Sequence, residues 1–390
     1  MAREVDSGRS LSLVCIAAIA TILSGAGSAL MGVCGPFTDV AADAFCPFVL
    51  EIFYLGITTG TTPTTYDPTS NVNRLQMAAF LSRSVDGVLK RGSHRAALQH
   101  FWTTQDASVL GLTTVGTTPE LLQSDGLDVW VANNGGTVSR VRGADGKLLE
   151  TWTGAAGAYG VLVAMGRVFV TGSPGNLYRI DPSKTAGAVT TVASTLGSSP
   201  FGISFDGSRI WTANFDTFSG SISIVTPGAT IPWTVTTVTT GFSKPIGILY
   251  DGASIWVTNV AASSLVRLDS AGAVLQTVTV GSGPAFPAFD GGNIWVPNGS
   301  NSVSVVRASS GAVLQTLTGN GLSTPIAAAF DGQRVLVTNN AGNSVSLWKA
   351  ADLTPLGSFS TGAGTKPVGA CSDGVHFWIT LTATLEVAQF

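Results

Sequence analysis

The sequence predicts an all-β fold, a seven-bladed β-propeller, behind a small N-terminal helical module. A phrase close to Phe-Asp-Gly-x-x-Ile-Trp returns seven times, and its glycines are Gly126, Gly166, Gly207, Gly252, Gly291, Gly332 and Gly374. Their spacing runs from 39 residues (Gly252 to Gly291) to 45 residues (Gly207 to Gly252). A repeat of this length with strand-like sequence patterns is typical of propeller blades. Blades are four-stranded antiparallel units that bury their faces only against neighbouring blades.

The fifth repeat shows the four strands most clearly. Residues 284–291 indicate a first strand that ends in an Asp-Gly turn, followed by strands at 293–298, 302–307 and 312–318. Period-2 alternation bounded by Gly, Asn, Ser and Asp is the pattern of half-buried strands, and Asp-Gly supplies the positive φ of tight hairpin turns. In six repeats a proline stands six residues before the Asp, where a strand entry needs no N–H donor. These prolines are Pro119, Pro200, Pro245, Pro284, Pro325 and Pro367. The second repeat has Tyr159 at this position and Met165-Gly166 at the turn.

The two ends of the repeat array predict how the ring closes. After Gly374 the chain holds only two more strand segments, residues 376–381 and 384–390. The sequence of residues 108–116 matches that of the fourth strands of the other repeats. We therefore expect the N-terminal strand to complete the last blade. The propeller is then predicted over residues 104–390, after a connector at residues 92–103.

The amino-acid sequences of the repeats resemble those of a known family. Residues 255–259 (Ile-Trp-Val-Thr-Asn) and 335–339 (Val-Leu-Val-Thr-Asn) are similar to the YVTN and NHL-like propeller repeats of secreted bacterial proteins. The resemblance covers the whole repeat array. It implies the fold but no single function, because such propellers host binding, scaffolding and catalysis alike.

The chain begins with the features of a secretory signal peptide, predicted at residues 1–29. Arg3 and Arg9 precede an apolar stretch at residues 11–23, and small residues lead to a cleavage site after Ala29. The apolar stretch is shorter than the roughly 20 residues that a membrane helix needs. We therefore expect an extracellular or cell-envelope protein without a transmembrane segment in the mature chain; a retained anchor is the alternative.

A segment of different composition, residues 34–91, separates the signal from the propeller. It opens with Phe-Thr-Asp-Val at residues 37–40, and a helical apolar pattern at 45–55 stops at Gly56. A loop with Tyr-Asp-Pro at 66–68 leads to a second amphipathic pattern from Val72 onward. This order of motifs resembles a single S-layer homology module.

The resemblance implies a contact with an anionic cell-wall polysaccharide at the start of the second helix. Arg74 maps to the arginine that makes this contact in the family, with Asn73, Gln76 and Asp39 as the neighbouring candidates. Two positions depart from the family pattern, because Asn73 stands where Thr is usual and Gln76 where an acidic residue is usual. Strongly anchored relatives carry three copies, and this chain has one. In the alternative interpretation Arg74 is a solvated helix-start residue and the module only packs on the propeller.

The cysteines fit an exported chain. Cys15 would leave with the signal peptide, whereas Cys34 and Cys46 flank the start of the small module. An oxidising compartment would let these two pair, so we expect a disulfide between them. Cys371, on the first strand of the seventh repeat, is expected to be a buried apolar residue.

The charge and histidine content argue against several classes of function. Lys plus Arg number 20 against 23 Asp plus Glu, and no basic stripe marks a nucleic-acid surface. The three histidines are His94, His100 and His376, and none has a partner at metal-ligand spacing. We therefore expect no nucleic-acid partner, no metal site and no cofactor.

Most of the remaining chemical side chains have repeat positions, which favours structural roles. The Asp-Gly aspartates are expected to cap their turns, and the phrase tryptophans to pack between blades. The asparagines that end second strands, among them Asn298 and Asn339, are expected to adopt left-handed turns. Trp233 differs, because it lies in the longest insertion (residues 215–240), and we predict a role in surface recognition for it. Glu120, on the first strand of the first repeat, is a lone carboxylate and a weak indication of acid–base chemistry.

These observations predict an exported cell-envelope protein. Its non-catalytic propeller would bind a protein or a glycan on one face, and its small module would hold it at the cell wall. One alternative is a propeller enzyme of the streptogramin-lyase-like class, which uses a histidine and a metal at the channel mouth. The first strands offer neither group, and His376 has no histidine partner. A second alternative is a structural surface-layer component.

Overall fold

The computed structural model describes residues 34, 36–41, 45–54, 58–81, 111–216 and 220–390. The chain divides into two compact units, Met1–His100 and Phe101–Phe390. The predicted signal peptide (1–29), the connector (92–103) and the start of the predicted propeller (104–110) lie outside the described residues. The first unit contains α2 (Cys46–Tyr54) and a second helical segment at residues 74–81.

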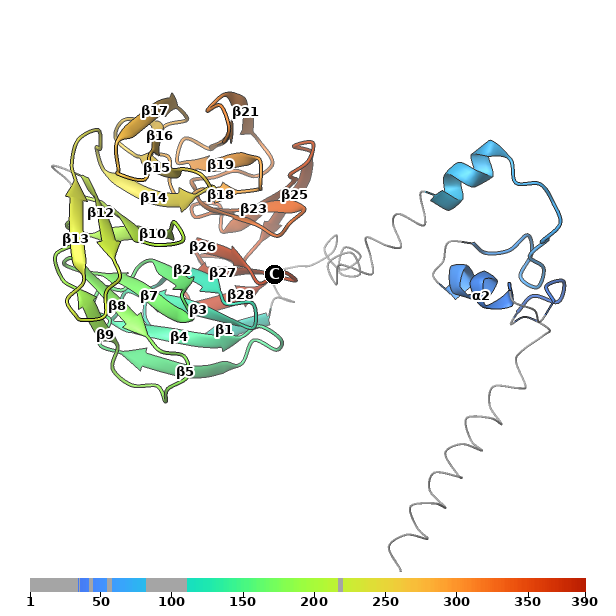
Figure 1. The fold of residues 1–390 in the computed structure, drawn as a ribbon, viewed down its shortest axis with the longest axis horizontal. Helices are drawn as coiled ribbons and strands as arrows, with labels where there is room; N and C mark the ends of the chain where they lie inside the picture. Colours follow the sequence, from blue (N-terminus) through green and yellow to red (C-terminus); the bar gives the residue numbers. More distant parts are fainter. Residues whose placement is uncertain (1–33, 35, 42–44, 55–57, 82–110, 217–219) are drawn as a thin grey trace, which may run out of the picture. The chain divides into compact units, whose positions relative to one another are not determined.

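The second unit is the predicted seven-bladed propeller, with one four-stranded antiparallel sheet for each blade (Figure 1). Blade one contains β2 (Pro119–Ser124), β3 (Asp128–Asn133), β4 (Thr137–Arg142) and β5 (Leu148–Thr153). Blade two contains β6 (Val161–Ala164), β7 (Arg167–Gly172), β8 (Asn176–Ile180) and β9 (Thr190–Ala193). Blade three contains β10 (Pro200–Phe205), β11 (Ile210–Asn214), β12 (Ser221–Thr226) and β13 (Thr234–Val238). Blade four contains β14 (Pro245–Tyr250), β15 (Ile255–Asn259), β16 (Ser264–Leu268) and β17 (Val274–Thr279). Blade five contains β18 (Ala288–Phe289), β19 (Asn293–Asn298), β20 (Ser302–Arg307) and β21 (Val313–Thr318). Blade six contains β22 (Pro325–Phe330), β23 (Arg334–Asn339), β24 (Ser344–Lys349) and β25 (Pro355–Ser360). Blade seven contains β26 (Pro367–Ser372), β27 (Phe377–Leu381), β28 (Glu386–Gln389) and β1 (Gly111–Thr114).

The order β1-β28-β27-β26 in blade seven confirms the predicted closure of the ring. β1 pairs antiparallel with β28, from Gly111 opposite Gln389 to Thr114 opposite Glu386. The N-terminal strand is therefore the outer strand of the last blade, and the chain runs on from it into blade one.

Five of the six Asp-Gly turns are joined to a tryptophan five residues later. The carboxylate accepts the indole N–H over 2.7 to 2.9 Å in five blades. These pairs are Asp125 with Trp130, Asp206 with Trp211, Asp251 with Trp256, Asp290 with Trp295, and Asp373 with Trp378. The other carboxylate oxygen caps the turn backbone, as at Asp251, which accepts the N–H groups of Ala253 (2.8 Å) and Ser254 (2.6 Å). Each of these five aspartates therefore fixes both its turn and the ring that packs between blades.

These bonds also set the ionisation of the turn aspartates. Burial alone would raise the pKa of Asp206, but the hydrogen bonds from Trp211 and from the backbone N–H groups of Arg209 and Ser208 favour its charged form. They bring the pKa of Asp206 to about 2. In blade six, where the tryptophan is replaced by Leu336, Asp331 instead accepts a hydrogen bond from Nε of Arg334 (2.9 Å).

The structure corrects the role predicted for the asparagines that end second strands. Four of them are fully buried inside their strands, and each donates from its side-chain amide to two hydroxyl groups at the start of the third strand, over 2.8 to 3.2 Å. They are Asn133, Asn214, Asn298 and Asn339. The left-handed backbone falls on turn residues such as Asn301 (φ 60) and Asn343 (φ 48) instead.

Neighbouring blades are joined through a threonine on the second strand. In four blades its hydroxyl accepts a backbone N–H from within or just before its own first strand, and donates to a carbonyl within or just before the first strand of the next blade. These donations run from Thr171 to Phe201 (3.1 Å), Thr258 to Ala285 (2.7 Å), Thr338 to Val368 (2.8 Å) and Thr380 to Glu120 (2.6 Å). The last of them connects blade seven to blade one.

The first strands surround the ring axis, and in Figure 1 the fourth strands β5, β9, β13 and β17 lie at the periphery. Side chains from all seven blades meet in one apolar group, which we term the channel cluster. It consists of Leu121, Tyr159, Phe201, Ile246, Ala285, Phe286, Ile326, Ala327 and Ala370. Because residues of seven different blades can meet only at the centre of a ring, this cluster lies on the ring axis.

One face of the ring carries the loops that precede the first strands together with the loops between second and third strands. Backbone bonds join the two sets, as from Asn134 to Thr118 (2.8 Å), from Phe215 to Ser199 (2.9 Å) and from Val260 to Lys244 (3.1 Å). We term this the entry face. The Asp-Gly turns lie at the opposite ends of the first strands.

Candidate functional site

The N-terminal module has a small core that holds its loops in place. Phe37 is fully buried and contacts the rings of Phe53 on α2 (centroids 5.1 Å apart) and Tyr66 (5.5 Å). Val40 and Val49 complete the buried group beside Cys34. The opening motif, the first helix and the Tyr-Asp-Pro loop therefore pack as one unit.

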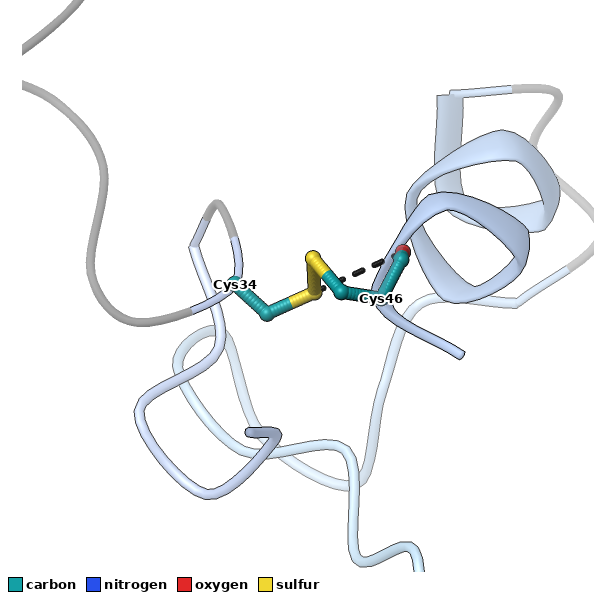
Figure 2. Close-up of a disulfide and its surroundings, with 2 residues drawn as sticks. All are labelled: Cys34 and Cys46. Atoms are coloured by element: carbon teal, nitrogen blue, oxygen red, sulfur yellow. Dashed lines mark hydrogen bonds between the residues drawn. A yellow bond between two sulfur atoms is a disulfide. The ribbon is translucent and has the colours of Figure 1, made fainter. Parts of the chain in front are cut away.

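The predicted cysteine pair forms a disulfide that ties the opening motif to the first residue of α2. Figure 2 shows Cys34 and Cys46 joined across the start of the helix, with Cα atoms 5.7 Å apart and a sequence separation of 12. Burial raises the pKa of the third described cysteine, Cys371, whose thiol is free and packs beside Leu122 and Trp378. This thiol therefore stays protonated at neutral pH.

Thiol counting tests the pairing. Protein that begins after Ala29 should show one free thiol, that of Cys371, under denaturing conditions, and three after reduction. A disulfide that closes a loop of this length stabilises a domain by about 3 kcal/mol. The module of a Cys34→Ser and Cys46→Ser double variant should therefore unfold at a much lower temperature than that of the parent. Three thiols before reduction would contradict the pairing.

Asp39, a candidate polysaccharide contact, uses its carboxylate to hold the Tyr-Asp-Pro loop. Its oxygens accept the backbone N–H of Tyr66 (2.8 and 3.1 Å) and of Asp67 (2.7 Å). The bond from Tyr66 is the main reason that the pKa of Asp39 is lowered. Asp67 itself has a left-handed backbone (φ 63). Asp39 therefore positions the loop in front of the second helix.

Asn73 and Gln76 form a capping box at the start of the second helix. Oδ1 of Asn73 accepts the backbone N–H groups of Leu75 (3.0 Å) and Gln76 (2.9 Å), and Oε1 of Gln76 accepts the backbone N–H of Asn73 (2.9 Å). This is the reciprocal arrangement that Ser or Thr forms with Glu in other helices. The two departures from the family pattern therefore make the same cap from uncharged groups.

Arg74 is the first residue of this helix, between the two capping residues in sequence. Its side chain is exposed, and no carboxylate of the described residues pairs with it. The N–H groups of the first helical turn place partial positive charge at the same end. The helix start therefore presents a fixed positive site to solvent.

The structure contradicts the surface role predicted for Trp233. The ring is only 7% exposed, packs 5.7 Å from Phe169 and donates its N–H to the carbonyl of Gly228 (2.9 Å). Blade two has Phe169 where most blades have tryptophan, and Trp233 of the next blade packs against this smaller ring. The insertion folds back to fill an inter-blade space, so Trp233 is a core residue.

The described residues contain no group of three His, Cys, Asp or Glu side chains that could hold a metal ion. His376, the histidine of the described ranges, lies 3.4 Å from Asp373 in the turn of the seventh repeat, away from the entry face. No helix in the described part of the chain is long and apolar enough to cross a membrane.

Comparisons with known proteins match each unit separately. Residues 36–78 match the S-layer homology domain family. No curated protein matches the sequence. The propeller is similar in structure to streptogramin B lyase (15% identity, TM-score 0.59, covering 73% of this chain and 99% of that chain). It is also similar to the WD40 propeller domain of Doa1 (12%, TM-score 0.60, 72% and 95%) and to Kuenenia stuttgartiensis hydrazine synthase (17%, TM-score 0.60, 71% and 97%).

Identities this low show the fold alone, whereas the family match covers the opening motif, α2 and the capped helix start. S-layer homology domains are cell-surface anchoring modules that bind cell-wall polysaccharide. The chain is therefore a seven-bladed β-propeller that carries an S-layer homology domain.

Proposed function

We propose that the chain is an exported cell-envelope protein whose S-layer homology domain binds an anionic cell-wall polysaccharide through Arg74. Its propeller would be a non-catalytic module that binds a protein or a glycan. The observation that carries the proposal is the exposed Arg74 at a capped helix start inside the matched residues 36–78.

The capping box explains how the neighbouring residues would assist. The capping bonds use only the oxygens of Asn73 and Gln76, so both side-chain NH₂ groups remain as donors beside Arg74. Asp39 holds the Tyr66 loop and would act by positioning. The guanidinium group of Arg74, flanked by two amide donors, suits a carboxylate or phosphate group of a polymer.

Retention on purified wall sacculi tests this proposal. An Arg74→Ala protein should be retained roughly tenfold or more weakly, because a charge-assisted contact is worth about 1.5–3 kcal/mol. Added salt should weaken the retention of the parent, because exposed charges are screened. Arg142→Ala, which removes an exposed arginine from a propeller hairpin, serves as the matched control and should bind like the parent.

Two outcomes would count against the proposal. Equal retention of the Arg74→Ala protein and the parent would remove Arg74 from the contact. Failure of both to bind would leave the module with a structural role only. An unchanged melting temperature of the variant shows that any loss is a loss of contact.

A further inference from the structure

Glu120 is the one charged residue in the seven first strands. It follows Pro119 at the entry-face end of β2 and precedes Leu121 of the channel cluster. The corresponding stretches of the other blades hold apolar, small or hydroxyl side chains, with Tyr159 in blade two. A carboxyl group therefore stands at the mouth of an otherwise apolar channel.

The surroundings of this carboxyl group leave it poorly compensated. Burial is the main reason that the pKa of Glu120 rises to about 7, and the hydroxyl of Tyr159, a neutral donor, offsets this only in part. The elements packed on β2 are β3, β6, β26 and β27. Besides Tyr159, which precedes β6, their titratable groups are Asp128, bonded to Arg140 (2.7 Å), and Cys371. No cation of the described residues pairs with Glu120.

A row of aromatic rings extends from Tyr159 along the entry face. Tyr159 stacks on Phe201, with centroids 4.0 Å apart and planes 25° apart, and Phe201 stacks on Phe215 at 5.5 Å and 22°. Nζ of Lys244 lies 6.0 Å from the Phe215 ring, at the far end of the row from Glu120. All five side chains are partly exposed.

We propose that the entry-face mouth of the channel binds an alkylammonium group, with the Glu120 carboxylate as its counter-ion and the ring of Tyr159 as its wall. A desolvated carboxylate gains most from a cationic partner, and aromatic faces attract an ammonium group within about 6 Å. A polyol fits less well, because the neighbours Ile246, Ala285 and Ile326 offer no side-chain hydrogen bonds and would leave its hydroxyl groups unpaired.

The inference rests on the propeller being the binding module proposed above, and it does not rest on wall anchoring. It gives binding a defined pH dependence. The ammonium group pairs with the ionised form of Glu120, so affinity is full above the pKa and falls as the pH drops below about 7. Linkage makes binding about thirtyfold weaker at about pH 5.5 than at about pH 8.5.

Titration calorimetry with the mature full chain tests the inference. The probes are butylammonium chloride and Nα-acetyl-lysine amide, and Nα-acetyl-norleucine amide is the neutral control. We expect saturable binding of an ammonium probe that strengthens with pH, and none of the control. Binding of both ammonium probes identifies a lysine side chain as an acceptable source, whereas binding of butylammonium alone identifies a small amine.

Three variants separate the carboxylate from the fold. Glu120→Gln should lose ammonium binding at every pH. Tyr159→Phe keeps the ring but removes the hydroxyl that lowers the Glu120 pKa, so the midpoint of the pH dependence should move upward. Glu386→Gln removes a partly exposed carboxylate of blade seven and should bind like the parent.

The inference is overturned if no ammonium probe binds, or if the norleucine control binds equally. Binding that strengthens toward acid, or that survives in Glu120→Gln, overturns it as well. Retention on wall sacculi depends on Arg74 and not on Glu120, so a failure of this site and a failure of wall anchoring give different results.

Discussion

Deleting residues 111–115 is expected to open the ring and lower the melting temperature of the propeller by roughly 10 °C. The deletion removes β1, and with it the pairing to β28 and the bond from the N–H of Val115 to the carbonyl of Leu385 (2.9 Å). Val115 also packs against the buried group around Leu122 and Trp378. Four or five hydrogen bonds and one apolar contact are together worth on the order of 3–5 kcal/mol.

A thermal melt followed by circular dichroism measures this effect. Leu112→Ala is the matched control, because it leaves the backbone pairing of β1 intact and removes a side chain that is already 49% exposed. The control should melt within a few degrees of the parent. A deletion protein that melts with the control would show that blade seven does not depend on the N-terminal strand.

Replacing one inter-blade tryptophan should cost almost as much. Trp256 is fully buried between Leu265 and Val278 of blade four and Ile294 and Val306 of blade five. Trp256→Ala removes this packing and costs about 3–5 kcal/mol. The change also leaves Oδ2 of the aspartate in the Asp-Gly turn without its indole donor.

Chemical denaturation of a graded series measures this cost. Trp256→Leu should lose less stability than Trp256→Ala, because blade six folds with Leu336 at the same repeat position. Trp256→Phe keeps most of the volume and isolates the loss of the 2.7 Å hydrogen bond to Asp251, worth about 1 kcal/mol. An alanine variant as stable as the parent would show that blades four and five do not depend on this ring.

The repeat made the architecture predictable from sequence, because every blade gives the same period and the same turn. The second and third strands predicted for the fifth repeat, 293–298 and 302–307, coincide with β19 and β20. The first strand of the same repeat is shorter than predicted, since β18 covers only Ala288–Phe289. Pro287 lacks an N–H and interrupts the ladder just before it.

The errors at individual residues have a common physical cause, which is contact between segments far apart in sequence. Asparagine favours left-handed turns locally, but the serines of the third strand decide the role of Asn298 and Asn339. The long insertion around Trp233 predicts a surface position for this residue. In the structure Trp233 is buried, because it packs beside Phe169 of blade two, which is smaller than the tryptophan of most blades. In the sequence, only two features mark the proposed site: the lone Glu120 and, one blade later, Tyr159 in place of a proline. That these two side chains lie close together follows only from the ring geometry.

The capping box of the S-layer homology domain has a consequence for acid conditions. A cap built from a hydroxyl and a glutamate contains a group that titrates between about pH 3 and 6, and its charge opposes that of an adjacent arginine. Asn73 and Gln76 make the same bonds without any titrating group. The charge at this helix start therefore stays constant through the range in which such a glutamate would titrate. Acid release of the protein from a wall polymer would then report other carboxyl groups, those of the polymer or that of Asp39.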